Sequence, residues 1–396
     1  MRAPGGGRKS LYSEMEGELH DWIIAQRRLK LRVSRRKIKD KAAEMCRVPS
    51  FTASNGWLYR FLIKKNLSRR KRTTVCQKLP EEFAQKIARY VLFVRYLRMK
   101  NQYQMHDIYA ANETAVWLDA VSNDTIDTVG VKEVGIKTTG HEKNKITVLL
   151  TASPTRKVKP FVLINRVRPI KALDRFKSKL IICYSGKKTS MDDKLTEEYL
   201  KRSFGTTLFG RRRLLCWDSY RCHISESTKK VMKKLAMDMA VVPGGTTKYL
   251  QAPDVSWNKD FKKVLVDEYD KFMSDESQHS FTKGGNMRGP GFATVCDWIV
   301  KAWEELKMDT IEKSFKICAI TGNLDGSEDG EISCLKEGKA CHNALAVLED
   351  MKANNIAVTS LENVVDNEES VVNDALEELE DDDDDDEIIL NEEEMN

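Results

Sequence analysis

Between residues 105 and 320 the chain alternates short apolar runs with segments of helical periodicity. The apolar runs predict strands at residues 107–111, 145–152, 161–165, 180–183, 214–217 and 239–242. The periodic segments predict helices at residues 192–204, 225–235, 255–272 and 292–306. This alternation predicts an α/β domain whose central sheet is flanked by helices.

A separate all-α domain is predicted at residues 10–75. Its first helix starts at the capping-box pair Ser13 and Glu16, a second starts at Ser34, and Ser54 caps a third. The third helix has an apolar inner face and a basic outer face, which is the layout of a helix-turn-helix DNA reader. A three-helix bundle with a solvated charged face is the alternative. The candidate DNA-binding residues are Arg35, Arg36, Ser54, Asn55, Tyr59, Arg60, Lys64, Lys65, Arg69 and Arg70.

The charges segregate along the chain, although the net charge is only +6. Residues 1–75 contain 20 basic and 6 acidic side chains, whereas residues 361–396 contain 18 acidic side chains and no basic ones. A basic N-terminal domain favours a polyanionic partner such as double-stranded DNA, because neutralised phosphates release counterions. Residues 76–104 are predicted to form a helical linker, and residues 321–396 an acidic, largely disordered tail.

The cysteines and the hydropathy pattern restrict the compartment. Nine cysteines are scattered without the paired spacing of a zinc site, so we expect them to be reduced inside the cell. The sequence has no apolar stretch long enough to cross a bilayer and no signal-peptide core, so we expect no membrane association.

Three polar positions follow apolar runs or begin a helical pattern: Asn112, Asp218 and Asp254. A folded sheet that brings three carboxylates together can hold divalent metal for phosphodiester chemistry. Here the first position is an amide, which is a poorer ligand for Mg²⁺ than a carboxylate. Taken alone, Asp254 fits a helix cap and Asp218 fits a turn residue equally well.

Several motifs occur together and in order. They are residues 51–61 (FTASNGWLYRF), 113–119 (ETAVWLD), 137–143 (KTTGHEK), 217–223 (WDSYRCH), 243–247 (PGGTT) and 250–256 (LQAPDVS). On these motifs, residues 10–320 resemble the pogo-like transposases and their host-domesticated relatives in the mariner-type superfamily. The resemblance implies a centromere-protein-B-type helix-turn-helix domain at residues 10–75 and a DDE-type, ribonuclease-H-like domain at residues 105–320.

The resemblance also implies a site. In the family three carboxylates bind two divalent ions, which activate water and then the DNA 3′ hydroxyl. Asn112 stands at the first of these positions, and Asp218 and Asp254 match the second and third. The third motif departs from the family, which usually reads Gln-Pro-Leu-Asp where this chain has Gln251-Ala-Pro-Asp254. Glu113 would face away from the site on a strand, and Asp119 is too distant to replace Asn112.

The sequence therefore predicts a nuclear DNA-binding protein derived from a transposase, catalytically inactive and acting in transcription or chromatin. No cofactor is expected; Asp218 and Asp254 would retain at most a vestigial metal site. The alternative is an active transposase or nuclease that uses Mg²⁺ or Mn²⁺, and a third hypothesis is a scaffold whose acidic tail recruits proteins. Because one helix-turn-helix unit reads a half-site, and only a short lead precedes it, we expect a truncated product, a homodimer or a protein partner.

Overall fold

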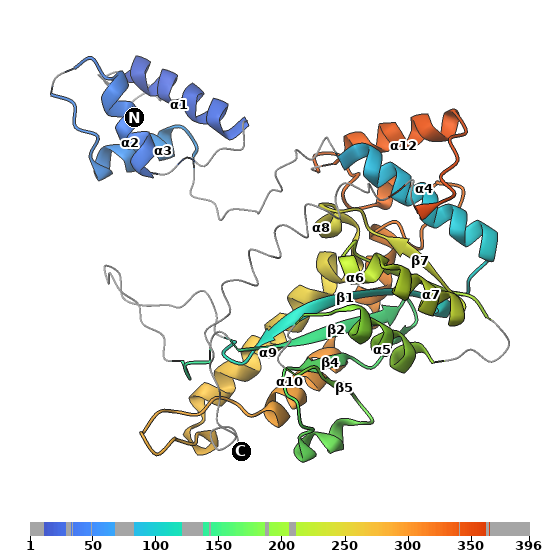
Figure 1. The fold of residues 1–396 in the computed structure, drawn as a ribbon. Coiled ribbons are helices and arrows are strands. Elements are labelled where there is room, and N and C mark those ends of the chain that lie inside the picture. Colours follow the sequence, from blue (N-terminus) through green and yellow to red (C-terminus); the bar gives the residue numbers. More distant parts are fainter. Residues whose placement is uncertain are drawn as a thin grey trace. The chain divides into compact units, whose positions relative to one another are not determined.

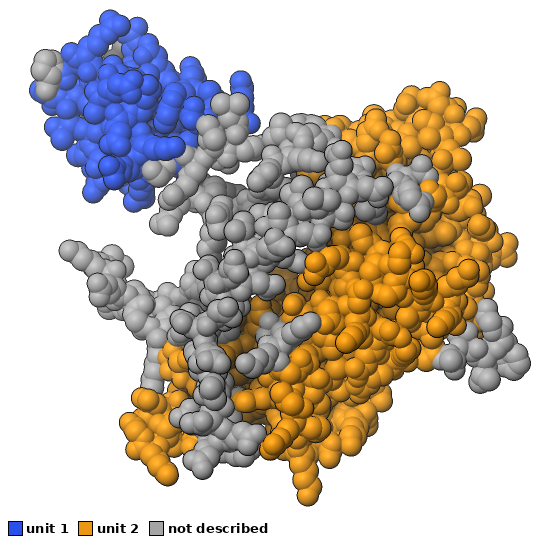
Figure 2. Space-filling view, in the orientation of Figure 1, with its two compact units in different colours: residues 1–75 blue, residues 76–396 orange. Residues whose placement is uncertain are grey.

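The computed structural model describes residues 12–28, 33, 35–48, 50–67, 83–120, 138–141, 144–186, 190–205, 211–339, 341–361 and 364. The chain divides into two compact units, residues 1–75 and residues 76–396 (Figure 2).

Unit 1 is a three-helix domain, as the sequence predicts. Its helices are α1 (Ser13–Arg28), α2 (Arg35–Met45) and α3 (Asn55–Lys64) (Figure 1). The Ser54 hydroxyl accepts a hydrogen bond from the Trp57 backbone N–H at 3.1 Å and so caps α3. The buried side of α3 presents Trp57, Leu58 and Phe61 to Leu19, Ile23, Ile38 and Ala42 of the other two helices. Burial of this apolar face is what stabilises such short helices.

Unit 2 contains one mixed sheet in the strand order β5-β4-β2-β1-β6-β7, with β3 paired to β2. The strands are β1 (Ile108–Trp117), β2 (Lys145–Ser153), β3 (Arg156–Lys157), β4 (Phe161–Ile164), β5 (Ile181–Tyr184), β6 (Arg213–Trp217) and β7 (Met237–Val241). β2 runs antiparallel to β1 and β4, whereas β6 runs parallel to β1 and β7. All six strands predicted from apolar runs are present.

Helices cover both faces of the sheet. The helices are α4 (Ala84–Asn101), α5 (Asp193–Phe204), α6 (Arg221–Ile224), α7 (Glu226–Lys234), α8 (Thr247–Leu250), α9 (Asn258–Ser274), α10 (Phe292–Glu305), α11 (Met308–Ile317) and α12 (Asn343–Ala353). One core joins the sheet to α4 and α8–α12, and a second core joins the other face to α5–α7. A one-turn π-helix, η5 (Pro253–Trp257), leads directly into α9. None of the helices within the described residues contains an apolar stretch that could span a bilayer.

Strand β1 is longer than predicted, and this changes the setting of Asn112. The apolar run ends at Ala111, so the sequence placed Asn112 after the strand. The structure places it inside a ten-residue strand, because backbone pairing with β2 continues from Ala110 to Trp117. Polar side chains such as Thr114 interrupt the apolar sequence pattern, but the backbone pairing of β1 with β2 continues past them.

The structure corrects two predicted boundaries. Helix α4 was expected to lie in a linker, but Ile87, Tyr90 and Val94 are completely buried in the larger core. The acidic tail was expected to start at residue 321, yet Leu348 of α12 is buried in the same core, where α12 packs against α4. The acidic composition of residues 321–396 masked α12. For α4 the apolar pattern predicts a helix, but it does not show what the helix packs against. Residues 365–396 lie outside the described residues.

Candidate active site at the ends of β1, β6 and η5

Sheet register brings the first two candidate positions together. Parallel pairing aligns Ala110 of β1 with Cys216 of β6. Two residues further along each strand, Asn112 and Asp218 are therefore level with one another on neighbouring strands. The β6 strand ends at Trp217, so Asp218 lies in the turn just beyond it.

The third position reaches the same place from η5. The Asn112 side-chain amide donates from Nδ2 to Oδ1 of Asp254 at 2.7 Å. The same Oδ1 accepts a second hydrogen bond at 2.8 Å from Nδ2 of Asn258, one turn along the helix. Asn112 is buried and Asp254 lies at the exposed rim. Two neutral amides therefore share one oxygen of this carboxylate.

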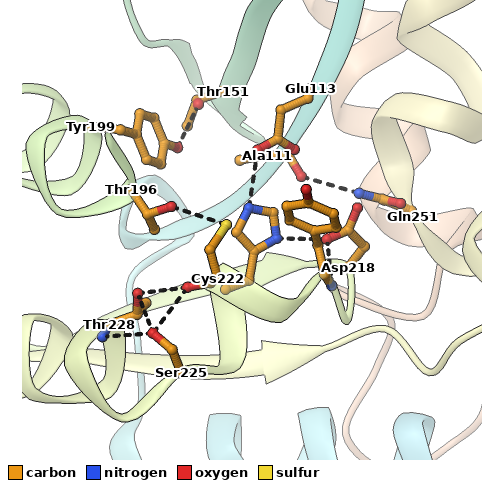
Figure 3. Close-up of polar contacts among 12 residues, drawn as sticks. Ala111, Glu113, Thr151, Thr196, Tyr199, Asp218, Cys222, Ser225, Thr228 and Gln251 are labelled. Carbon is orange, nitrogen blue, oxygen red and sulfur yellow. Dashed lines mark hydrogen bonds and ion pairs between the residues drawn. The ribbon is translucent and has the colours of Figure 1, made fainter. Parts of the chain in front are cut away.

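Asp218 is paired with a buried histidine that the sequence did not assign to the site. His223 is 1% exposed and stacks on the Trp217 ring, with 4.3 Å between ring centroids. One ring nitrogen, Nδ1, lies 2.6 Å from Oδ1 of Asp218, and the other, Nε2, lies 3.0 Å from Oε1 of Glu113. Figure 3 shows Glu113 and Asp218 approaching the same imidazole from two sides. The ring thus links β1 to the turn after β6.

The contacts of Asn112 and Glu113 confirm that adjacent residues of β1 face opposite sides. Asn112 contacts η5 on one face, and Glu113 contacts the histidine of α6 on the other. This follows from the alternation of side chains along a strand. Glu113 therefore does not replace the missing carboxylate beside Asp254.

The three ionisable groups have shifted pKa values. Burial alone would lower the pKa of His223, but the Glu113 and Asp218 carboxylates raise it well above its ordinary value. Burial alone would raise the pKa of Asp218, but the positive charge of His223 lowers it below the usual range. Desolvation raises the pKa of Asp254, and the Asp218 carboxylate adds to this rise while the Asn258 amide opposes it. In this site the carboxylates of Glu113 and Asp218 thus flank the positive charge of His223. The carboxyl group of Asp254, with its raised pKa, ionises less readily.

The donor set does not fit the three-carboxylate, two-metal site that the resemblance implies. Oδ1 of Asp254 is occupied by two amides, and Oδ1 of Asp218 by His223 and the backbone N–H of Tyr220. Glu113, Asp218 and His223 do lie together, with one ligand atom of each within 4.8 Å of the others. The two ring nitrogens face different carboxylates, however, so an ion bound to either nitrogen would separate the histidine from one partner.

Gln251 and Asp119 also lie near these groups. The Gln251 side chain hydrogen-bonds Asp218, which helps to lower the pKa of that carboxyl. Gln251 is buried, and its Nε2 donates to the Ala111 carbonyl at 3.4 Å (Figure 3). Asp119 is buried beyond the end of β1, where it accepts from the backbone N–H groups of Thr139 and His141 and from the hydroxyls of Thr139 and Tyr269. As the sequence predicts, Asp119 is not a substitute for Asn112; it fixes residues 138–141 to α9.

In unit 1 the candidate DNA-binding residues differ in how exposed they are and in which residues they contact. Tyr59 and Arg60 are exposed on α3, and Arg35 and Arg36 on α2. Ser54 is used as the cap of α3, and Asn55 accepts from Nζ of Lys39 at 3.4 Å. Lys65 ends α3 as its C-cap. Arg69 and Arg70 lie outside the described residues.

Lys64 has a partner that the sequence did not indicate. Its Nζ lies 2.7 Å from Oε2 of Glu16, a residue of α1 that is only 5% exposed. The sequence assigned Glu16 to the capping box of α1, and spacing alone gave no signal of this contact between α1 and α3. Lys64 therefore neutralises a buried carboxylate, and a DNA phosphate would compete with that carboxylate for it.

Family comparisons match both units. Residues 12–71 match the Tc5 transposase DNA-binding domain, and residues 143–315 match the DDE superfamily endonuclease family. The chain is 28% identical over 341 residues to a human protein named "Pogo transposable element with KRAB domain", covering 83% of this chain and 54% of the relative. The mouse protein of the same name is 28% identical over 351 residues, covering 86% of this chain and 56% of the relative. The chain thus spans about half the length of these relatives.

A solved structure supports the fold. The Mos1 mariner paired-end complex with Mn is similar to this chain with a TM-score of 0.50 at 9% identity, covering 83% of this chain and 82% of the Mos1 chain. At this identity the likeness concerns the fold alone. Together with the strand order, it confirms the prediction of a helical N-terminal domain followed by a ribonuclease-H-like α/β domain.

Proposed function

Because this chain is a pogo/Tc5-type transposase-derived protein with a helix-turn-helix domain and a DDE endonuclease domain, we propose that it is a sequence-preferring DNA-binding protein without nuclease activity. Unit 1 binds double-stranded DNA, and unit 2 keeps the transposase fold without its chemistry. The protein acts in the nucleus, in transcription or chromatin, and reaches a full DNA site as a homodimer or with a protein partner.

The observation that carries this proposal is the hydrogen bond from Asn112 to Asp254. An amide at the first position removes one negative charge from the site. At about 4 Å and an effective dielectric near 20, a unit charge pair contributes roughly 4 kcal/mol of attraction before screening. The amide also presents a donor to Asp254, so two of the three positions bind each other.

The surface of unit 1 supports DNA as the partner. The N-terminal 75 residues carry 20 basic and 6 acidic side chains. Arg60 and Tyr59 are exposed on α3, the helix that enters the major groove in helix-turn-helix domains. Arg35 and Arg36 are exposed at the start of α2, where phosphate contacts are expected.

A nicking assay with Mn²⁺ tests the proposal that unit 2 has no nuclease activity. The full chain is compared with Asn112→Asp, with Asp218→Ala and with the double variant, on a supercoiled plasmid. We expect nicking only by Asn112→Asp, because that substitution gives the site three carboxylates, whereas the double variant, which lacks Asp218, again has only two. Nicking by the natural protein that Asp218→Ala abolishes would contradict the proposal. It would favour the alternative, an active transposase or nuclease with an unusual ligand set.

A further inference from the structure

Two large apolar side chains are exposed on the helix proposed to read DNA. Tyr59 is 64% exposed and Ile63 is 62% exposed, and they are the only exposed large hydrophobic side chains among the described residues of unit 1. They lie four residues apart on α3, so they share one face of the helix. Folding does not explain them, because the opposite face supplies the core with Trp57, Leu58 and Phe61.

The surroundings of this pair are polar and basic. Arg60 follows Tyr59 and is exposed, and Gly56, one turn before Arg60, has no side chain to cover the surface. Lys39 of α2 contacts Asn55 at the start of α3. An apolar strip with cationic neighbours matches the major groove, where phosphates line the edges and the thymine C5-methyl group is the apolar feature of the floor.

We propose that Ile63 and Tyr59 recognise thymine C5-methyl groups in the major groove and so set the sequence preference of this protein. The inference rests on the proposed function, because it requires that α3 binds DNA. Arg60 supplies phosphate or guanine contacts beside the pair, whereas the two apolar side chains select thymine through contact rather than hydrogen bonding.

A second copy of this chain is a less suitable occupant for the same strip. Residues 1–75 carry a net excess of basic side chains, 20 against 6 acidic ones. Packing two such α3 faces together would place Arg60 of each copy near that of the other. Like charges of this kind oppose association, whereas DNA phosphates favour it.

The test is a double-mutant cycle, in which one side chain of the protein and one methyl group of the DNA are removed separately and together. Preferred duplexes are first selected from a randomised library with the full-length chain. The thymines of the selected site are then replaced by uracil one at a time, and each replacement removes only the C5-methyl group. Affinity for both probes is measured for the natural protein, for Ile63→Ala and for Tyr59→Ala. Ile356→Ala is the matched control, since Ile356 is an exposed isoleucine of unit 2 (47% exposed).

We expect the natural protein and the control to bind a uracil probe about fourfold more weakly at each contacted position, the value of one buried methyl group. Ile63→Ala or Tyr59→Ala should bind the thymine probe that much more weakly and should no longer distinguish thymine from uracil at the position that the removed side chain contacts. Equal thymine-to-uracil ratios for the natural protein and both variants would overturn the inference. So would a change in oligomeric mass caused by Ile63→Ala, which would assign the strip to a second copy.

Failure of the proposed function has a different signature. If the natural protein shows no salt-dependent binding and selects no sequence, DNA binding itself is absent and both conclusions fall. If it binds with a steep salt dependence but without coupling between Ile63 and the methyl group, only the thymine inference falls. Thermal melting of each variant confirms that unit 1 is folded in every comparison.

Discussion

Asn112 and Asp254 are joined by a 2.7 Å hydrogen bond between strand β1 and the π-helix that precedes α9. The two residues are 142 positions apart in sequence. The bond couples the positions that match the first and third metal-binding carboxylates of the family. At the first of these positions a neutral amide stands where the family has a charged carboxylate.

The first prediction concerns the stability of Asn112→Asp. In EDTA this variant should be destabilised by about 1–3 kcal/mol, because it loses a hydrogen bond and places two carboxylates together. Mn²⁺ should recover most of that loss, since a cation binds the new carboxylate pair only in the folded state. Thermal melting with and without Mn²⁺ measures both effects. Asn112→Ala is the control: it loses the hydrogen bond but should show no Mn²⁺ response.

His223 should make the stability of unit 2 depend on pH. Its pKa is raised in the folded protein, so its contribution is fully present below the unfolded pKa of about 6.5 and is lost as pH rises through the folded pKa. His223→Gln should therefore cost about 2–3 kcal/mol near pH 6 and less at alkaline pH. Urea denaturation of both proteins across pH 5.5–10 measures the difference. A constant difference over that range would show that the imidazole is not charged in the folded state.

Arg60 and Lys64 should respond differently to substitution, although both lie on α3. Arg60→Ala should weaken DNA binding and reduce the salt slope by about 1, with the melting temperature of unit 1 unchanged. Lys64→Ala should lower the melting temperature by leaving Glu16 buried without its partner, a loss of about 1–2 kcal/mol given that Lys64 is half exposed. The double variant Glu16→Gln/Lys64→Met should recover stability. Loss of stability by Arg60→Ala would contradict this division.

Asp119 should be a stability residue rather than a catalytic one. Asp119→Asn replaces an acceptor of four hydrogen bonds with an amide that opposes some of those donors, so we expect a loss of about 2–4 kcal/mol. Urea denaturation of unit 2 gives this value. Asp267→Asn, an exposed position on α9, should be near neutral. A neutral Asp119→Asn would show that the carboxylate does not order residues 138–141.

Much of this protein could be predicted from its sequence, because the information is local. The apolar residues of α3, such as Trp57 and Phe61, recur at helical spacing. The apolar runs that become β2 and β6 are short and continuous. The motifs around Asn112, Asp218 and Asp254 likewise occur in order along the chain, so the residues of the candidate site could be named before their positions were known.

The tertiary structure alone decided how these residues satisfy one another. The pairing of β1 with β2 carries Asn112 into a strand, and the register with β6 sets it level with Asp218. The links from His223 to Glu113, from Lys64 to Glu16 and from Leu348 to the core join residues far apart in sequence. Local periodicity reports which side of an element is apolar. It does not report which distant polar group will meet a buried charge, because that depends on how the packed elements align.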